Sequence, residues 1–276
     1  MDKKIIELIK QALIEDGYDN DVTTFNLINK DMMLSGSFIV KATGVVSGID
    51  VAKEVFRQIN PKIKMEILKD NGTFVNRGDV IASIEGPMRD ILRGERVALN
   101  FLQRMSGIAA TTAKFVQELA GTECKILDTR KTTPLLRVLE RQAVRDGGGM
   151  NHRYNLSDQV LIKDNHIAAV GSIEKAVEMV RKSVGKTMKI EVEVETKEEF
   201  LEALGTSADI IMLDNMNEAA MAEAVRYIAG RALVEASGDV TEERICAIAE
   251  TGVDIISIGR ITHSVKALDI SLRFKI

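Results

Sequence analysis

Cysteine is scarce in this sequence: only Cys124 and Cys246 occur among its 276 residues. Each lies in a hydrophobic segment without a second cysteine or a histidine at the spacing of metal ligands, so we expect buried, reduced thiols. A small disulfide-stabilised protein is excluded. The composition, 45% hydrophobic and 28% charged, also excludes a disordered chain and a collagen.

Long apolar runs are absent as well. No stretch of the sequence approaches the roughly 18 apolar residues that a membrane span needs. The first residues read as an amphipathic helix interrupted by charges and not as a signal peptide. We therefore expect a cytoplasmic protein that has no membrane among its partners.

The sequence has no strong excess of either charge. Its 37 Lys and Arg against 41 Asp and Glu give a net charge of −4. Such a chain offers nucleic acid no global attraction, so nucleic acid is not an expected partner. Any site for an anion must be a local concentration of Lys and Arg.

The length predicts two domains, since 276 residues divided by about 150 per domain gives roughly 1.8. The first 110 residues combine an opening helix with short strand-like segments, which indicates an α+β domain; these segments are Met33–Lys41, Gly44–Ser47, Lys64–Ile67 and Gly78–Ile84. Helical patterns at Glu95–Gln103 and Ala109–Leu119 lead into the second domain. Because no Ser/Gly-rich linker separates the domains, we expect them to pack together.

From about residue 125 onward, strand-like and helical segments alternate. The candidate strands are Lys125–Thr129, Val160–Lys163, Lys189–Val194, Asp209–Asp214, Ala232–Ser237 and Asp254–Gly259. Candidate helices lie between the later ones, at Glu174–Val184, Lys197–Leu204, Glu218–Ile228 and Glu242–Glu250. This run of βα units predicts parallel strands that either close into a TIM-like barrel or stay open as a doubly wound sheet.

Cationic side chains gather at the ends of the early strands, where a βα barrel places its active site. These are Arg130, Lys131, His152, Arg153 and Lys163. Arg binds a carboxylate or phosphate through two parallel hydrogen bonds and Lys acts as a point charge, so the mixture indicates a substrate with several anionic groups. Surface ion pairs with nearby aspartates remain the alternative.

His166 lies in the same stretch of sequence, and a hydrogen-bonded histidine at a helix or strand end explains it as well as ligand binding does. Arg137, Arg141 and Arg145 lie on a predicted helix, where we favour a solvated surface.

The later strands end in acidic and small residues. Glu195 and Asp214 follow consecutive strands, and two carboxylates at one mouth can bind Mg²⁺ together with substrate phosphate. Ser237-Gly238 and Ser257-Ile258-Gly259 provide hydroxyl and backbone N–H groups suited to a phosphate. Simple strand alternation also explains Glu195, because Glu191 and Glu193 precede it at alternate positions.

Several longer motifs resemble the quinolinate phosphoribosyltransferase family. They are Asp128-Thr129-Arg130-Lys131-Thr132-Thr133-Pro134, Asn151-His152-Arg153, Leu161-Ile162-Lys163-Asp164-Asn165-His166, Leu213-Asp214-Asn215, Glu235-Ala236-Ser237-Gly238 and, earlier, Glu95-Arg96-Val97-Ala98-Leu99-Asn100-Phe101. The resemblance implies an α/β fold in which an N-terminal α/β sandwich domain, residues 1–112, packs on an incomplete seven-stranded TIM-like α/β barrel, residues 113–266. It leaves open that the tail, about residues 267–276, packs with the first domain.

The resemblance also implies roles for individual residues. Arg130, His152, Arg153 and Lys163 would hold the two carboxylates of quinolinate, while Lys131 and Lys163 would reach 5-phosphoribosyl-1-pyrophosphate. Glu195 and Asp214 match the carboxylates around Mg²⁺ and the ribose hydroxyls, and the catalytic group would be Lys131, Lys163, Glu195 and Asp214. The binding set is completed by Thr129 and by the loop residues Ser237, Gly238, Asp239, Ser257, Ile258 and Gly259.

The implied assembly is a homodimer, with larger assemblies open, in which Arg96 enters the partner's site. The implied reaction is decarboxylating phosphoribosyl transfer to quinolinate, in NAD biosynthesis. Three loop positions depart from the family pattern. Leu135 and Asn155 stand where Gly is common, and Asp239 stands where Gly or Asn is common. The alternatives are a Schiff-base aldolase using Lys163 and a ligand-sensing or transport-accessory protein without turnover.

Overall fold

The computed structural model describes residues 1–275, which form two compact units. The first unit comprises Met1–Ala113, Thr132–Gly148 and the segment from Ile261, and the second comprises Lys114–Lys131 and Gly149–Arg260. The grouping differs from a single break after residue 112, because Thr132–Gly148 belongs with the first unit. There, Arg104 donates hydrogen bonds of 2.9 and 2.6 Å to the buried carboxylate of Glu140.

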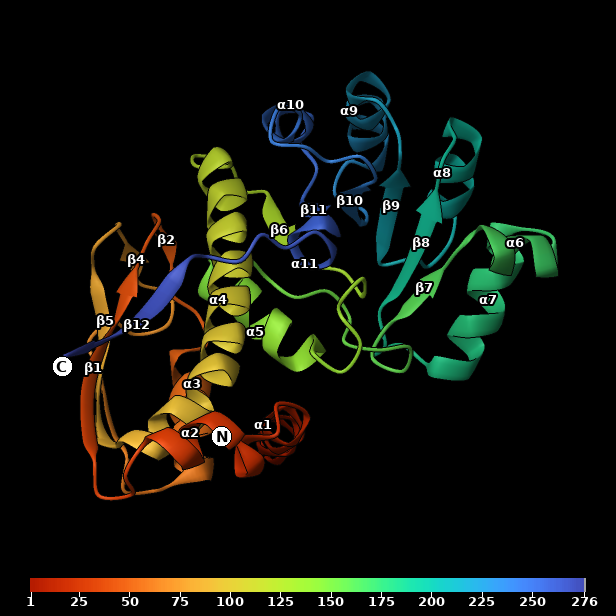
Figure 1. The fold of residues 1–276 in the computed structure, drawn as a ribbon. Helices are drawn as coiled ribbons and strands as arrows, with labels where there is room; N and C mark the ends of the chain where they lie inside the picture. The colour runs from red at the N-terminus through yellow and green to blue at the C-terminus, as the bar shows by residue number, and fades with distance from the viewer. Residues whose placement is uncertain (276) are drawn as a thin grey trace. The chain divides into compact units, whose positions relative to one another are not determined.

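The first unit is built on an antiparallel four-stranded sheet in the order β12-β1-β5-β3 (Figure 1). Its strands are β1 (Met33–Val40), β3 (Lys64–Ile67), β5 (Val80–Pro87) and β12 (Ile270–Lys275). Buried and more exposed residues alternate along β1, as expected for a sheet with one face on a core. A two-stranded sheet pairs β2 (Gly44–Val45) with β4 (Phe74–Val75).

The first unit also contains helices outside its sheets. They are α1 (Lys3–Glu15), the 3-10 helix η1 (Tyr18–Asn20), α2 (Val22–Leu27), α3 (Ile49–Ile59) and α5 (Arg137–Asp146). The amphipathic pattern of the first residues is confirmed, since α1 buries Ile5, Ile9 and Leu13. Asp2 caps this helix by accepting a hydrogen bond from the Lys4 backbone N–H at 2.9 Å.

A single long helix, α4 (Met88–Glu118), replaces the two helical segments expected from the sequence. It continues through Gly107, which a helix normally disfavours. A Cβ at Gly107 would lie 2.3 Å from the carbonyl oxygen of Lys266, so only glycine lets the returning chain approach the helix this closely. The short helix α11 (Arg260–His263) precedes that returning segment.

The second unit contains a parallel sheet in the order β6-β11-β10-β9-β8-β7. The strands are β6 (Lys125–Leu127), β7 (Val160–Ile162), β8 (Ile190–Val194), β9 (Ile210–Asp214), β10 (Leu233–Ser237) and β11 (Ile255–Ser257), so all six candidate strands are confirmed. A single parallel bridge joins Leu127 to Met150 beyond β6. The sheet of a TIM-like barrel is thus present, with this bridge where a seventh full strand was expected.

Helices connect the strands of this sheet, and Figure 1 shows α7, α8 and α9 along the outer side of the sheet. The helices are α6 (Asp164–Val170), α7 (Ile173–Val184), α8 (Lys197–Leu204), α9 (Glu218–Ile228) and α10 (Ile245–Glu250). The predicted α8 and α9 are confirmed, whereas α10 begins three residues later than expected. No helix within residues 1–275 has the length and apolarity to cross a membrane.

Candidate active site

Strand register brings the predicted polar residues to one end of the parallel sheet. Ser237 of β10 is level with Asp214 of β9, and Glu193 of β8 is level with Met212 of β9. Side chains alternate between the faces of a strand, so Met212 and Asp214 share one face. The neighbouring strands therefore carry their polar groups on that same face, at the carboxyl end where parallel sheets bind ligands.

A cavity of about 390 Å³ opens among these strand ends. Its predicted lining residues are Thr129, Arg130, Lys131, His152, Arg153, Lys163, Asp214, Ser237 and Ser257. Leu161, Glu193 and Met212 also line it and were not predicted. The volume lies within the usual range for a small-molecule site, and the side chains combine cations, carboxylates and hydroxyls.

Glu193, and not Glu195, is the β8 carboxylate that lines this cavity. Its carboxylate accepts a short hydrogen bond from Lys163 Nζ across β7 and β8. Strand β8 ends at Val194, so Glu195 is exposed, and its backbone N–H donates to Glu199 Oε2 at 2.8 Å. Thr196 and Glu199 form a reciprocal capping box that starts α8 and turns the chain away from the strand direction.

The other predicted residues outside the cavity lie in loops or in the first unit. Arg96 is exposed on α4. Gly238 and Asp239 continue the chain after β10 with left-handed backbone angles, φ +87° and +44°. Ile258 is buried and its N–H donates to the carbonyl of Leu127 at 2.9 Å, with Gly259 following it.

Two guanidinium groups lie together in the cavity. Arg153 is only 8% exposed, and its Nη1 donates to the carbonyl oxygen of Gln159 at 3.0 Å. Burial, together with the positive charge of Arg130, lowers the pKa of Arg153. Each effect makes the charged guanidinium less favourable until an anion is near, so the cavity is electrostatically prepared for an anionic ligand.

Beneath the cavity lies a buried cluster that the sequence analysis did not identify. His152 Nε2 lies 3.2 Å from Glu191 Oε2 and 3.5 Å from Glu235 Oε1. A charged glutamate inside an otherwise apolar strand, such as Glu235 in β10, was the available signal.

The hydrogen on the His152 ring can be placed from its contacts. The backbone N–H of Arg153 donates to His152 Nδ1 at 2.7 Å, and a nitrogen that accepts cannot itself carry hydrogen. The ring hydrogen then lies on Nε2, which makes the cluster a hydrogen-bonded group and not a set of metal ligands.

A tight turn holds the β9 and β10 ends in place. Asn215 Nδ2 donates to Asp214 Oδ2 at 2.8 Å, and the Asn215 backbone N–H donates to the carbonyl of Ser237 at 2.9 Å. Gly238 packs directly on this asparagine, because a Cβ there would lie 2.0 Å from Asn215 Oδ1. The carboxylate of Asp214 is therefore oriented from both strands.

Comparison with known families agrees with this geometry. The model of "Quinolinate phosphoribosyl transferase, N-terminal domain" matches residues 21–106, and that of the corresponding C-terminal domain matches residues 108–273. The chain belongs to the quinolinate phosphoribosyltransferase family. The resemblance found in the sequence motifs is thus confirmed over nearly the whole chain.

Individual relatives of the quinolinate phosphoribosyltransferase family are similar over the same length. A probable nicotinate-nucleotide pyrophosphorylase [carboxylating] of Bacillus subtilis is 41% identical over 266 residues, covering 96% of this chain and 92% of the relative. The crystal structure of NadC from Streptococcus pyogenes has a TM-score of 0.94 at 40% identity, covering 98% of this chain and 95% of its own. The nicotinate-nucleotide pyrophosphorylase from Francisella tularensis has a TM-score of 0.95 at 38% identity, covering 99% and 96%.

His166 is not among the residues that line the cavity at the strand ends. It is exposed at the start of α6, and its Nδ1 accepts a hydrogen bond from the Lys163 backbone N–H at 3.0 Å. Of the two explanations left open for His166, the structure therefore favours the hydrogen-bonded histidine at a helix end.

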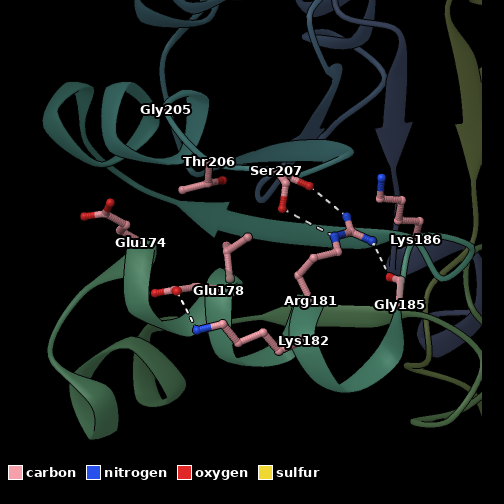
Figure 2. Close-up of a pocket in the computed structure, with 10 residues that line it drawn as sticks. Glu174, Glu178, Arg181, Lys182, Gly185, Lys186, Gly205, Thr206 and Ser207 are labelled. Carbon is pink, nitrogen blue, oxygen red and sulfur yellow. Dashed lines mark hydrogen bonds and ion pairs between the residues drawn. The ribbon is translucent and has the colours of Figure 1, made fainter.

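A second cavity, of about 430 Å³, lies between α7 and the loop after α8 (Figure 2). Its arginine, Arg181, donates to the carbonyl oxygens of Gly185 at 3.0 Å and Ser207 at 2.7 Å, and to Asp209 Oδ2 at 2.7 Å. Lys182 pairs with Glu178 at 2.6 Å. These cations already serve the local fold, so this cavity is not a second candidate for the substrate site.

Proposed function

We infer that the chain catalyses the decarboxylating transfer of the phosphoribosyl group of 5-phosphoribosyl-1-pyrophosphate to quinolinate. The products are nicotinate mononucleotide, pyrophosphate and CO₂, a reaction of NAD biosynthesis. The observation that carries this conclusion is the cavity at the strand ends, whose lining combines the cations Arg130, Lys131, Arg153 and Lys163 with Asp214, Ser237 and Ser257. Such a lining suits ligands that carry anionic groups, hydroxyls and phosphate.

The cationic part of the wall suits a dicarboxylate. Arg130 and Arg153 each present a planar group that can bind one carboxylate through two hydrogen bonds, and Lys163 supplies a further charge beside Glu193. Ser237 and Ser257 offer hydroxyls for the 5′-phosphate, while Asp214 can accept hydrogen bonds from the ribose hydroxyls. The two substrates thereby meet with the pyridine nitrogen near the anomeric carbon.

The chain's groups stabilise charge and hold orientation during the reaction. The bond between the anomeric carbon and pyrophosphate breaks, and positive charge develops on the ribose as in glycoside cleavage. Asp214 lies where it can stabilise that charge, and Lys131 can neutralise the departing pyrophosphate. The pyridine nitrogen then bonds to the anomeric carbon. The pyridinium ring accepts the electron pair released as the 2-carboxylate leaves as CO₂, and a proton adds at that carbon.

A Mg²⁺ ion fits part of this site. Asp214 is a carboxylate in the cavity, and Mg²⁺ prefers one or two carboxylates together with phosphate oxygens and water. When bound, the ion would neutralise charge on the pyrophosphate. We propose Asp214 as the residue that would hold it. Glu195 lies outside the cavity lining, and Glu193 is already paired with Lys163.

The assembly and the location follow as further proposals. A homodimer in which Arg96 completes the partner's site is supported by the family motif around Arg96 and by its exposure on α4. Cytoplasmic location stays a prediction. The aldolase alternative needs the Lys163 amine to attack a carbonyl carbon, whereas Lys163 Nζ is engaged by the Glu193 carboxylate.

The proposed function is tested by incubating the protein with quinolinate, 5-phosphoribosyl-1-pyrophosphate and Mg²⁺. Nicotinate mononucleotide and CO₂ are followed together, with nicotinate as the parallel substrate. We expect equal amounts of both products from quinolinate and no nucleotide from nicotinate. Nucleotide formed from nicotinate alone would contradict the proposal, and bound ligand without product would favour the sensing protein.

A matched pair of lysine variants connects the reaction to the cavity. Lys131→Ala removes an exposed cation that lines it, and we expect kcat to fall about 100-fold, as is typical when one charge-stabilising donor is lost. Lys186→Ala removes an exposed lysine at the second cavity and should leave kcat unchanged within about 2-fold. Equal kcat values in the two variants would remove Lys131 from the mechanism.

A further inference from the structure

The position of Arg153 depends on its neighbour in sequence. Its guanidinium is fixed by the hydrogen bond to the carbonyl of Gln159 at 3.0 Å. Its backbone is fixed by the hydrogen bond from its own N–H to His152 Nδ1 at 2.7 Å. If the ring of His152 turned, this second contact would break and the backbone from which the guanidinium extends would move.

The other ring nitrogen of His152 faces two buried glutamates. Its Nε2 faces Glu191 Oε2 at 3.2 Å and Glu235 Oε1 at 3.5 Å, and its backbone N–H donates to Asp128 Oδ1 at 2.8 Å. Glu191 lies on β8 and Glu235 on β10, one on each side of β9, and neither is among the residues lining the cavity. Both ring nitrogens of His152 are thus engaged inside the fold.

The burial of these carboxyl groups calls for an explanation beyond stability. The exposed fractions of Glu191 and Glu235 are 0% and 1%. Gln159 Nε2 donates to Glu191 Oε2 at 2.9 Å, yet Glu191 Oε1 and Glu235 Oε1 are buried without a hydrogen-bond partner. Burial, together with the negative charge of Glu235, raises the pKa of Glu191. Such an arrangement is expensive in a barrel interior, where apolar residues would pack without penalty.

We propose that Glu191 and Glu235 are positioning residues for quinolinate binding, acting through His152 on Arg153. Glu191 Oε2 accepts the hydrogen on His152 Nε2, Glu235 Oε1 lies beside it at 3.5 Å, and Nδ1 is thereby kept free of hydrogen. Nδ1 then accepts from the Arg153 backbone N–H, and the guanidinium is held at the cavity wall. His152 thus acts as a brace, since its ring holds the backbone of Arg153 in place. The proposal deepens the function proposed above and rests on it.

Substitutions at Glu191 separate this role from simple packing. Glu191→Met removes the acceptor while keeping a similar volume, and Glu191→Gln retains an oxygen that can accept from Nε2. We expect Glu191→Met to raise the KM for quinolinate about 10-fold or more, because small misplacements of a binding group are costly. The KM for 5-phosphoribosyl-1-pyrophosphate should change less than about 2-fold, and Glu191→Gln should restore the quinolinate KM to within about 3-fold of the parent.

Unchanged quinolinate KM in a folded Glu191→Met would overturn the proposal, and so would an equal rise in both KM values. If Glu191→Met does not fold, Glu235→Gln, which also retains an acceptor oxygen, is compared with Glu235→Met in the same assay. Equal quinolinate KM values for that second pair would again count against the brace.

The tautomer of His152 gives a readout on the unmodified protein. With three histidines in the chain, ¹⁵N-labelled imidazoles can be assigned by replacing His166 and His263 in turn. We expect hydrogen on His152 Nε2 and none on Nδ1 from about pH 6 to about pH 8, because Nδ1 accepts from the Arg153 backbone N–H. A ring that titrates near pH 6.5, an imidazolium across this range, or one equivalent of tightly bound metal in the purified protein would each refute the brace.

The imidazole ¹⁵N spectrum and the turnover assay distinguish a failure of this proposal from a failure of the proposed function. Failure of the parent protein to turn over quinolinate refutes the proposed function, whereas the tautomer is measured without substrate. Quinolinate affinity measured by calorimetry then shows whether the brace affects binding in the absence of turnover.

Discussion

Replacing Gly238 with alanine tests how the turn after β10 orients the carboxylate of Asp214, which we propose as a catalytic group. Gly238 has φ +87°, and an added Cβ would lie 2.0 Å from Asn215 Oδ1 and 2.9 Å from the Asn215 backbone nitrogen. The side chain of Asn215 could rotate away, but its backbone is tied to Ser237 by a 2.9 Å hydrogen bond. The alanine therefore displaces the residue whose amide holds Asp214.

The expected loss has two parts. A residue with a Cβ in the left-handed region costs about 1–2 kcal/mol. Overpacking against a constrained neighbour costs about 1–3 kcal/mol more. Gly121→Ala measures the first part alone, since Gly121 has φ +89°, belongs to the same unit and has nothing within 4 Å of an added Cβ. The difference between the two variants is thus about 1–3 kcal/mol in the free energy of unfolding.

The assay is urea unfolding of the parent and both variants, followed by steady-state kinetics. Because Asn215 Nδ2 donates to Asp214 Oδ2, Gly238→Ala should also raise the KM for 5-phosphoribosyl-1-pyrophosphate about 10-fold, whereas Gly121→Ala should leave it unchanged. Equal losses in the free energy of unfolding of the two variants would show that the close approach between Gly238 and Asn215 does not affect stability. The reasoning about the turn would then be wrong.

Two further outcomes are expected. Ala229 ends α9 with φ +47° and ψ +44°, so Ala229→Gly should raise the free energy of unfolding by about 0.5–1 kcal/mol; a loss in urea unfolding would contradict the strain assigned to this position. If Arg96 completes the partner's site, a randomly reassembled 1:1 mixture of Arg96→Ala and Lys163→Ala chains should regain up to about a quarter of parental activity per site, because half of the dimers are mixed and each mixed dimer has one intact site of two. No recovery from dimers confirmed as mixed would refute shared sites.

The parallel sheet was predictable from the sequence because its signals are local. Each candidate strand is a short apolar or β-branched segment, and the structure places each strand within two residues of the predicted ends. The interruption expected in α4 was wrong for a non-local reason. Gly107 weakens a helix in isolation, but here it gives room to the carbonyl of Lys266, more than 150 positions later in the chain.

The site was predictable in its residue types and less so in its geometry. Glu193 and Glu195 are two residues apart, so alternation alone assigns both to one face. The end of β8 at Val194 decides between them, and the Thr196-to-Glu199 capping box that sets this end was readable in the sequence. The contact of His152 with Glu191 and Glu235 was not readable, because it depends on how three separate segments meet.

The sheet of the first unit also constrains how the protein can be made. Strand β12, Ile270–Lys275, pairs with β1 along six residues, from Ser35 opposite Lys275 to Val40 opposite Ile270. A ribosome synthesises β1 more than 200 residues before β12, so during translation the nascent first unit has an unpaired edge on β1. All six strands of the second unit's sheet have been synthesised once the ribosome has passed Ser257. Folding on the ribosome is therefore expected to finish with the part of the chain that was synthesised first.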